Sequence, residues 1–125
     1  SHQAITILKR MHLITGRNHF IFRGQNDHKG TISTDSVNTA LNLIGYCTKK
    51  EHCFHGFRAS ARTLLEEQLQ FRPDFIEQQL AHKVRDANGR AYNRTKFIPE
   101  RTQMMQKWAD YCDQLKNDYI EGKIK

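Results

Sequence analysis

The sequence lacks the long apolar runs and paired cysteines that mark membrane-spanning and secreted proteins. No run approaches the roughly 20 apolar residues that a helix needs to cross a bilayer. The first residues lack the charge, apolar block and cleavage site of a signal peptide. Cys47, Cys53 and Cys112 are odd in number and form no CxxC pair, which favours free thiols in a reducing compartment. Cys47, His52, Cys53 and His55 form the only Cys/His cluster, and its spacing matches no ordinary zinc pattern.

Other sequence signatures of enzymes are also missing. The sequence contains no P-loop and no dinucleotide fingerprint. Its carboxylates stand mostly beside lysine or arginine, as on solvated faces, so no carboxylate–metal nuclease site is visible. We therefore predict no cofactor and no metal.

Negative charge is scarce relative to positive charge. The chain has 13 acidic against 20 basic residues, a net charge of +7 and a pI of about 9.5. This balance favours a polyanionic partner, with nucleic acid ahead of a membrane surface. The alternative is a structural protein whose basic charge only keeps it soluble.

Length and composition fit a globular protein. A chain of 125 residues corresponds to one domain or a piece of one, and it can bury roughly two-thirds of its unfolded surface. The apolar fraction is 38% and the charged fraction 26%, which is typical of folded rather than disordered chains. We predict a single domain over residues 1–125.

Periodicity and helix-ending residues predict a mainly α fold. The first helix follows Ser1 and stops at Gly16, and the second follows Ser33 or Thr34 and stops at Gly45. A third begins near Cys53 or Phe54. The two prolines, Pro73 and Pro99, open a fourth and a last, long helix. Residues 19–23 form at most a short extended segment, and residues 25–31, 86–89 and 91–95 are predicted as loops or short polar stretches.

Apolar residues at helical spacing predict the core of a bundle-like domain. Tyr46 is expected to pack back on the second helix. The expected core positions of the last three helices are Phe57, Ala61, Leu64, Leu65 and Leu69, then Phe75, Ile76 and Leu80, then Met105, Trp108, Cys112, Leu115 and Tyr119.

His55 and Arg58 are three residues apart at the start of the predicted third helix, so their side chains share a face, which Arg62 extends. The helix N-terminus favours an anion and a neutral, proton-accepting imidazole. Arg58 offers a planar fork of donors that fits phosphate oxygens. The alternative is an exposed polar face with a capping histidine, because His-x-x-Arg is a short pattern.

Two further residues carry candidate chemistry. His82 ends the fourth helix, where the dipole favours a charged imidazole that could donate to a phosphate oxygen. Tyr92 fits no apolar period and lies between Arg90 and Arg94, whose charges would help activate a phenol that is otherwise a poor nucleophile. The plainer alternatives are a surface histidine and a tyrosine that only touches DNA backbone.

In order, His55-Gly56-Phe57-Arg58, Leu80-Ala81-His82 and a tyrosine ten residues later form a specific combination. The whole stretch resembles the C-terminal half of the catalytic domain of tyrosine recombinases, the phage integrase family, and prophage and genomic-island integrases in particular. The resemblance covers most of the chain. It implies site-specific DNA recombination, integration or excision, without metal through a 3′-phosphotyrosine intermediate.

Residue by residue, the resemblance makes Arg58 the second phosphate-binding arginine and His55 the histidine before it. His82 matches the Leu-x-His histidine, although many members have glycine where this chain has Ala81. Tyr92 matches the nucleophile. The family's first arginine and its lysine, which protonates the leaving 5′ oxygen, fall upstream of Ser1, as do its other DNA-binding domains. The chain is therefore expected to be a truncated catalytic domain, inactive alone.

Further expectations follow from the resemblance. They are duplex DNA as partner, other protomers in a synaptic tetramer, possible accessory DNA-bending proteins, no membrane, and a bacterial cytoplasmic location at the nucleoid. The runner-up function is a small helical DNA-binding module without chemistry. The cations predicted to contact DNA are Arg62, Lys83, Arg85, Arg90 and Arg94.

Overall fold

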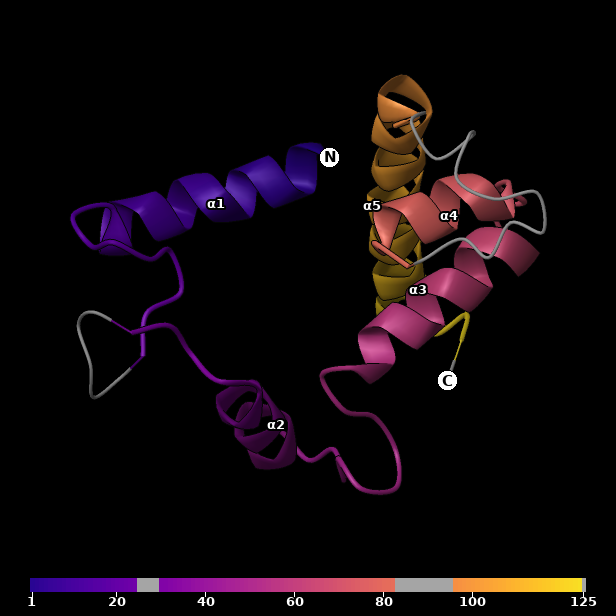
Figure 1. Ribbon diagram of the computed structural model, residues 1–125. Coiled ribbons are helices and arrows are strands. Elements are labelled where there is room, and N and C mark those ends of the chain that lie inside the picture. The colour runs from indigo at the N-terminus through magenta and orange to yellow at the C-terminus, as the bar shows by residue number, and fades with distance from the viewer. Residues whose placement is uncertain (25–29, 83–95, 125) are drawn as a thin grey trace. The chain divides into compact units, whose positions relative to one another are not determined.

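The computed structural model describes residues 1–24, 30–82 and 96–124, and within these ranges the chain forms five helices (Figure 1). They are α1 (His2–Thr15), α2 (Thr34–Leu43), α3 (Gly56–Glu67), α4 (Pro73–Gln79) and α5 (Ile98–Ile120). The same ranges contain no β-strand, only one isolated antiparallel bridge between Arg23 and Thr31. The prediction of a mainly α chain with at most a short extended segment near residues 19–23 is confirmed.

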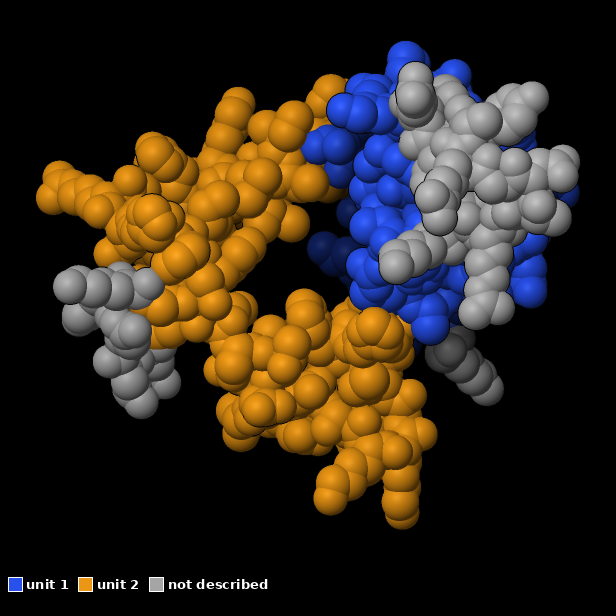
Figure 2. All heavy atoms as spheres, viewed as in Figure 1, with its two compact units in different colours: residues 1, 58–125 blue, residues 2–57 orange. Residues whose placement is uncertain are grey.

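The chain divides into two compact units, which Figure 2 colours separately. One unit is residues 2–57, with α1 and α2. The other is Ser1 with Arg58–Lys125, and it holds most of α3 together with α4 and α5. That residues 1–125 form a single domain stays a prediction. None of the helices described is both long enough and apolar enough to pass through a bilayer.

Local signals fix the ends of the helices in the unit of residues 2–57. The Thr15 hydroxyl at the end of α1 lies 2.9 Å from the Met11 carbonyl oxygen and 2.8 Å from that of Ile21. The Ser33 side chain caps α2 by accepting from the Ser36 N–H at 3.1 Å, and Gly45 follows with φ of 103°. The limits of α2 were predicted from its capping residue and from glycine's access to positive φ, and the end of α1 was predicted from Gly16.

The start of α3 differs from the prediction. The helix begins at Gly56 rather than near Cys53 or Phe54, because these residues are engaged elsewhere. The Phe54 N–H donates to the Asn38 side chain at 2.8 Å, and the Cys53 carbonyl accepts from the Gly56 N–H at 2.9 Å in a turn. Phe57, predicted to be in the core, is half-exposed, and its ring forms a T-shaped contact with the ring of His52.

The core of the other unit lies among α3, α4 and α5. Leu65, Ile76, Leu80 and Met104 are its buried members, each contributed by one of these helices or by the residue that ends α4. Partly buried apolar residues surround them: Leu69, Phe71, Phe75, Met105 and Trp108. Pro73 opens α4 as predicted, and a helix of 7 residues needs such packing to persist.

The apolar seam predicted on α5 is only partly correct. Met104, absent from the predicted seam, is the fully buried residue of α5, whereas Cys112 is exposed and Tyr119 is 67% exposed. The exposure of Cys112 and Tyr119 follows from the difference in length between α5 and α4. The 23 residues of α5 extend about 35 Å, while the 7-residue α4 that packs on it covers about 10 Å. Periodicity gives the helical face, but not how far along the helix a neighbour reaches.

Candidate functional site

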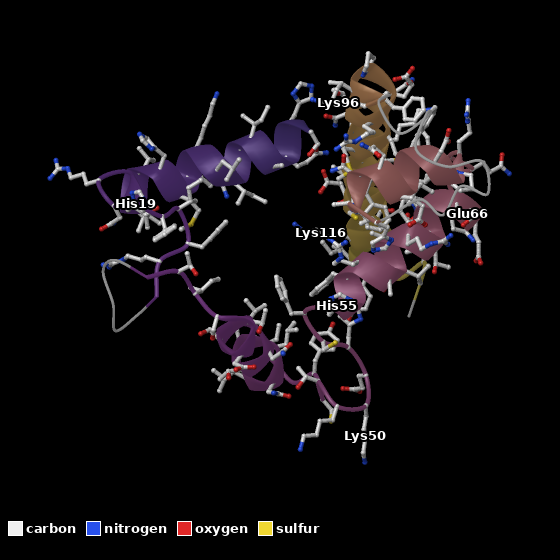
Figure 3. All side chains as sticks on the ribbon, in the orientation of Figure 1. His19, Lys50, His55, Glu66, Lys96 and Lys116 are labelled. Atoms are coloured by element: carbon white, nitrogen blue, oxygen red, sulfur yellow. The ribbon has the colours of Figure 1, made fainter. Side chains whose placement is uncertain are left out.

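The structure describes three of the predicted catalytic residues. Arg58 is the third residue of α3 and His82 is the second residue beyond the C-cap of α4. His55 directly precedes α3 and is exposed, rather than lying within the helix as predicted (Figure 3). Tyr92, Lys83, Arg85, Arg90 and Arg94 lie outside the described residues.

The end of α4 sets the position of His82. The His82 N–H donates to the Glu77 carbonyl at 3.0 Å, and the Ala81 N–H donates to the Gln78 carbonyl at 3.3 Å. This pair of bonds is a Schellman motif, in which the residue after the C-cap adopts a left-handed conformation. Ala81 holds that place with φ of 53°. The motif turns the chain sharply at Ala81 and brings His82 back beside Glu77.

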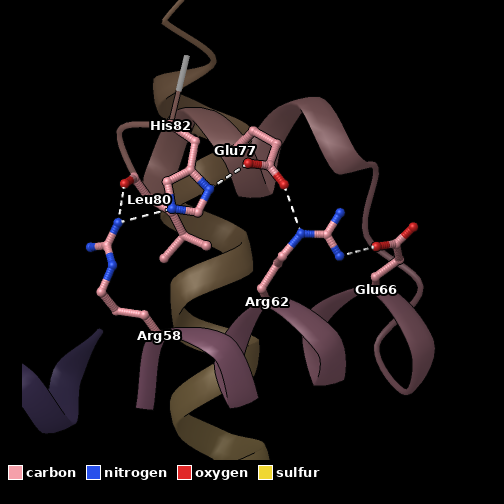
Figure 4. Close-up of polar contacts among 6 residues, drawn as sticks. All are labelled: Arg58, Arg62, Glu66, Glu77, Leu80 and His82. Atoms are coloured by element: carbon pink, nitrogen blue, oxygen red, sulfur yellow. Dashed lines mark hydrogen bonds and ion pairs between the residues drawn. The ribbon is translucent and has the colours of Figure 1, made fainter. Parts of the chain in front are cut away.

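Arg58 reaches from α3 to this turn (Figure 4). Its Nη2 donates to the Leu80 carbonyl oxygen and also lies 3.3 Å from Nε2 of His82. Leu80 is a core residue, so the guanidinium is tied to a fixed point of the packed unit. The predicted pair Arg58 and His82, 24 residues apart in the sequence, therefore meets at one exposed place.

Sequence reasoning missed Glu77, which supports the pair from the other side. One carboxylate oxygen, Oε2, lies 2.6 Å from Nδ1 of His82, and the other, Oε1, accepts from Nε of Arg62 at 2.8 Å. The contact between Glu77 and His82 could have been predicted from the Schellman motif. Glu77 and His82 occupy the two positions, three residues before the C-cap and two after it, whose side chains commonly touch. In this chain a polar pair replaces the usual apolar one.

Arg62 connects the network to a second carboxylate. Its Nη1 lies 2.8 Å from Oε2 of Glu66, one helical turn further along α3. The hydrogen bonds to Glu77 and then to Glu66 raise the pKa of the Arg62 guanidinium. That Arg62 contacts DNA stays a prediction, and the structure shows its guanidinium engaged by two carboxylates.

The charge of Glu77 reflects two opposed effects. Partial burial raises the pKa of its carboxyl, but hydrogen bonds from His82 and Arg62, and their charges, outweigh burial and leave that pKa below its usual value. Glu77 is therefore an anion at neutral pH and cannot donate. Since its oxygen faces Nδ1 of His82, the proton of that contact belongs to Nδ1.

The arrangement can bind an anion on its exposed side. Arg58 supplies guanidinium donors, and Nε2 is the ring nitrogen of His82 that faces away from Glu77 toward Arg58. Both side chains are solvent-accessible, so a phosphate oxygen could reach them. Within residues 1–24, 30–82 and 96–124, no group of three or more His, Cys, Asp or Glu side chains is placed to hold a metal ion.

Comparison with known proteins relates this geometry to a family. The chain is 42% identical over 125 residues to the integrase of Enterobacteria phage P4, which covers 99% of the chain and 28% of that protein. It is 35% identical over 115 residues to the prophage integrase IntZ of Escherichia coli K12, covering 92% of the chain and 28% of IntZ. It is also 35% identical over 115 residues to the integrase of Shigella phage Sf6, covering 91% of the chain and 29% of that protein.

The chain spans under a third of the length of these curated relatives. No family model and no solved structure matches it. Relatives named integrase or prophage integrase match nearly the whole chain at 35–42% identity, and the chain accordingly corresponds to one segment of a phage-integrase-type protein.

Proposed function

We propose that the chain provides the phosphate-binding and nucleophile-bearing part of a tyrosine-type, site-specific DNA recombinase. The observation that carries the proposal is the meeting of Arg58 with His82 at 3.3 Å. The sequence motif singles out both residues for the same phosphate, and separate helices bring them together. Similarity to integrases at 35–42% identity supports the same class of reaction.

In the proposed reaction, Tyr92 attacks the scissile phosphorus in line. The P–O5′ bond breaks as the bond to the tyrosine oxygen forms, which conserves the phosphodiester energy in a 3′-phosphotyrosine. The phenolic proton passes to a base, for which a neutral His55 is the candidate, and the leaving 5′ oxygen takes a proton from a general acid. Arg58 and His82 stabilise the charge that develops on the non-bridging oxygens.

The chain alone is proposed to be inactive. The family's first arginine and its lysine have no counterpart among the residues that the motif assigns in this chain. Loss of one preorganised donor typically costs about 10²–10³ in rate, and losses within one catalytic unit need not multiply. Efficient cleavage of a nicked site by the 125-residue chain would contradict this part of the proposal.

The nucleophile is tested by covalent capture on a nicked suicide substrate, using a full-length integrase that carries this sequence. Adduct is separated from free protein on a denaturing gel. Tyr92→Phe should abolish the adduct, because the phosphotyrosyl bond requires the phenolic oxygen. Tyr111→Phe and Tyr119→Phe are matched controls on α5 and should form adduct at the normal rate.

The same assay separates the proposal from the runner-up. If Tyr92→Phe still forms adduct, the assignment of the nucleophile is wrong. If no tyrosine variant matters and the normal protein forms no adduct, the chain is better explained as a DNA-binding module without chemistry. Duplex DNA, a synaptic tetramer, accessory DNA-bending proteins and a cytoplasmic site of action belong to the recombinase proposal.

A further inference from the structure

Glu77 is the one carboxylate that contacts the ring of His82 in the network of Figure 4. It lies on α4, its side chain is only 20% exposed, and among the described residues each of its oxygens has one partner. Neither the motif that predicts the site nor the family resemblance assigns it a function. Its two contacts are well suited to orienting another group, because they come from opposite sides of the carboxylate.

We propose that Glu77 is a positioning residue for His82: it fixes the ring through Nδ1 and so presents Nε2 to the phosphate beside Arg58. This inference rests on the proposed function. Among the residues that the structure describes, the charged groups that face Glu77 are Arg62 from α3 and His82, and the charged group that faces Nε2 of His82 is Arg58, also from α3.

The physical argument begins with the two ring nitrogens. An anionic carboxylate 2.6 Å from Nδ1 holds the proton on that nitrogen, so in the neutral ring Nε2 carries the lone pair. Nε2 is then the ring nitrogen that can take up a proton at the site, and it can give a proton only after it has done so. If it takes up a proton to donate to a phosphate oxygen, the nearby Glu77 carboxylate stabilises the resulting imidazolium. A carboxylate behind a histidine acts in the same way in other enzymes and metal sites.

The second argument concerns rigidity. His82 is exposed and lies just past the end of α4, where a side chain held by one contact would sample several rotamers. Glu77 is itself held by the Nε of Arg62, which comes from α3. The chain of contacts therefore anchors the ring of His82 to α3 and α4 together. The Schellman motif at the end of α4 fixes the backbone of His82, and Glu77 fixes its side chain.

The first experiment reads the ring directly in the 125-residue chain. Long-range ¹⁵N–¹H spectra report which ring nitrogen carries the proton, with His82→Gln used to assign the signals. Glu77→Met keeps the length of the side chain and its helix propensity but cannot accept a hydrogen bond. Glu66→Met is the matched control, since Glu66 also binds Arg62 but does not touch His82. Glu77→Gln keeps one acceptor oxygen.

We expect the neutral ring to carry its proton on Nδ1 in the unmodified chain, in Glu66→Met and largely in Glu77→Gln. In Glu77→Met both nitrogen shifts should move toward the average of the two tautomers. Ring spectra that are unchanged in Glu77→Met would show that Arg58 alone determines the tautomer, and would overturn the proposal. Trp108 fluorescence, which reports on the core of this unit, confirms that each variant is folded.

The second experiment measures the rate of covalent capture in the full-length integrase. Glu77→Met should slow adduct formation about tenfold to a hundredfold, as removal of an outer partner of a functional histidine commonly does, while Glu66→Met stays within about twofold. Equal rates for the two variants would overturn the positioning role. In that case loss of adduct in Tyr92→Phe would still support the proposed function. If the unmodified protein forms no adduct, the proposed function fails, while the ring spectra still decide whether Glu77 positions His82.

Discussion

Among single residues, Ala81 adopts a left-handed backbone conformation after α4, at a position where two other helices have glycine. The helices α2, α4 and α5 all end in the same pattern of backbone hydrogen bonds. The residue in the left-handed position is Gly45 after α2 and Gly122 after α5, with φ of 103° and 72°. After α4 it is Ala81, with φ of 53°. A residue with a Cβ in this region costs about 1–2 kcal/mol relative to glycine.

Ala81→Gly should therefore stabilise the unit that contains α4. Relief of the left-handed conformation exceeds the extra entropy that glycine gives the unfolded chain, so the free energy of unfolding should rise by about 0.5–1 kcal/mol. Urea unfolding followed by Trp108 fluorescence measures it. Ala59→Gly is the control, because Ala59 is exposed inside α3 and its replacement should lower the free energy of unfolding by about 1 kcal/mol. A loss in both variants would show that Ala81 is not strained.

Glu77 gives a pH dependence with a defined sign. Its pKa is lowered in the folded chain, so its ionised form contributes stability that is present above the ordinary carboxyl pKa of 4.5 and is lost as pH falls through the folded value. We expect Glu77→Gln to lower the free energy of unfolding by at most about 1 kcal/mol at neutral pH. This difference should vanish in acid. A difference that stays constant from about pH 7 to pH 3 would indicate lost packing rather than lost charge.

At the scale of the elements, features set by local chemistry were predicted and features set by distant neighbours were not. Ser33, Gly45 and Pro73 mark helix ends because each satisfies or removes a backbone group within a few residues. The start of α3 was placed too early, because the competing partner of Phe54 is Asn38, which is 16 residues away.

In the candidate site too, some residues were predicted from the sequence and others depend on how distant helices pack. The motif singled out Arg58 and His82, since their residue types suit a phosphate, but the role of Glu77 depends on how α4 ends and on which turn of α3 faces it. Arg62 shows the limit most clearly. Its charge and spacing favour a DNA contact, whereas its engagement by Glu66 and Glu77 depends on the packing of α3 against α4, which sequence spacing does not specify.

Two substitutions on α5 measure the difference between a position that periodicity predicts to be buried and one that the neighbouring helices do bury. Met104→Ala should lower the free energy of unfolding by about 2–4 kcal/mol, because it removes a fully buried side chain from the core among α3, α4 and α5. Tyr119→Ala, at a position that periodicity placed in the seam, should cost less than about 0.5 kcal/mol, because the side chain is mostly exposed and alanine has the higher helix propensity. Urea unfolding monitored at Trp108 compares the two. Similar losses would mean that the predicted seam is buried along its whole length.

At the scale of the whole molecule, net charge is the property that can be counted from the sequence without a structure. The net charge of +7 is the difference between 20 basic and 13 acidic residues, and four of the five cations predicted to contact DNA lie in residues 83–94, outside the described residues. Two explanations of DNA binding are therefore distinct. Either the overall charge attracts the polyanion, or these four cations, which follow His82 and flank Tyr92, form a local phosphate-binding segment.

We expect the 125-residue chain to bind duplex DNA weakly and without strong sequence preference, with an affinity that falls steeply between low and physiological salt as counterions cease to drive binding. Two quadruple variants with glutamine in place of four cations separate the explanations, since both lower the net charge by four. One variant changes Lys83, Arg85, Arg90 and Arg94, and its matched control changes the exposed Lys9, Arg17, Lys49 and Lys50.

If residues 83–94 hold the phosphates, the first variant should lose most of the affinity and reduce the slope of log K against log salt by up to about 0.9 per contact removed, whereas the control should keep most of both. Fluorescence anisotropy of a labelled duplex over a salt series measures both quantities. Equal losses in the two variants would mean that overall charge alone attracts DNA. Affinity independent of salt, or a strong preference for one sequence in competition, would contradict phosphate-dominated binding altogether, because base contacts rather than phosphate contacts would then supply the affinity.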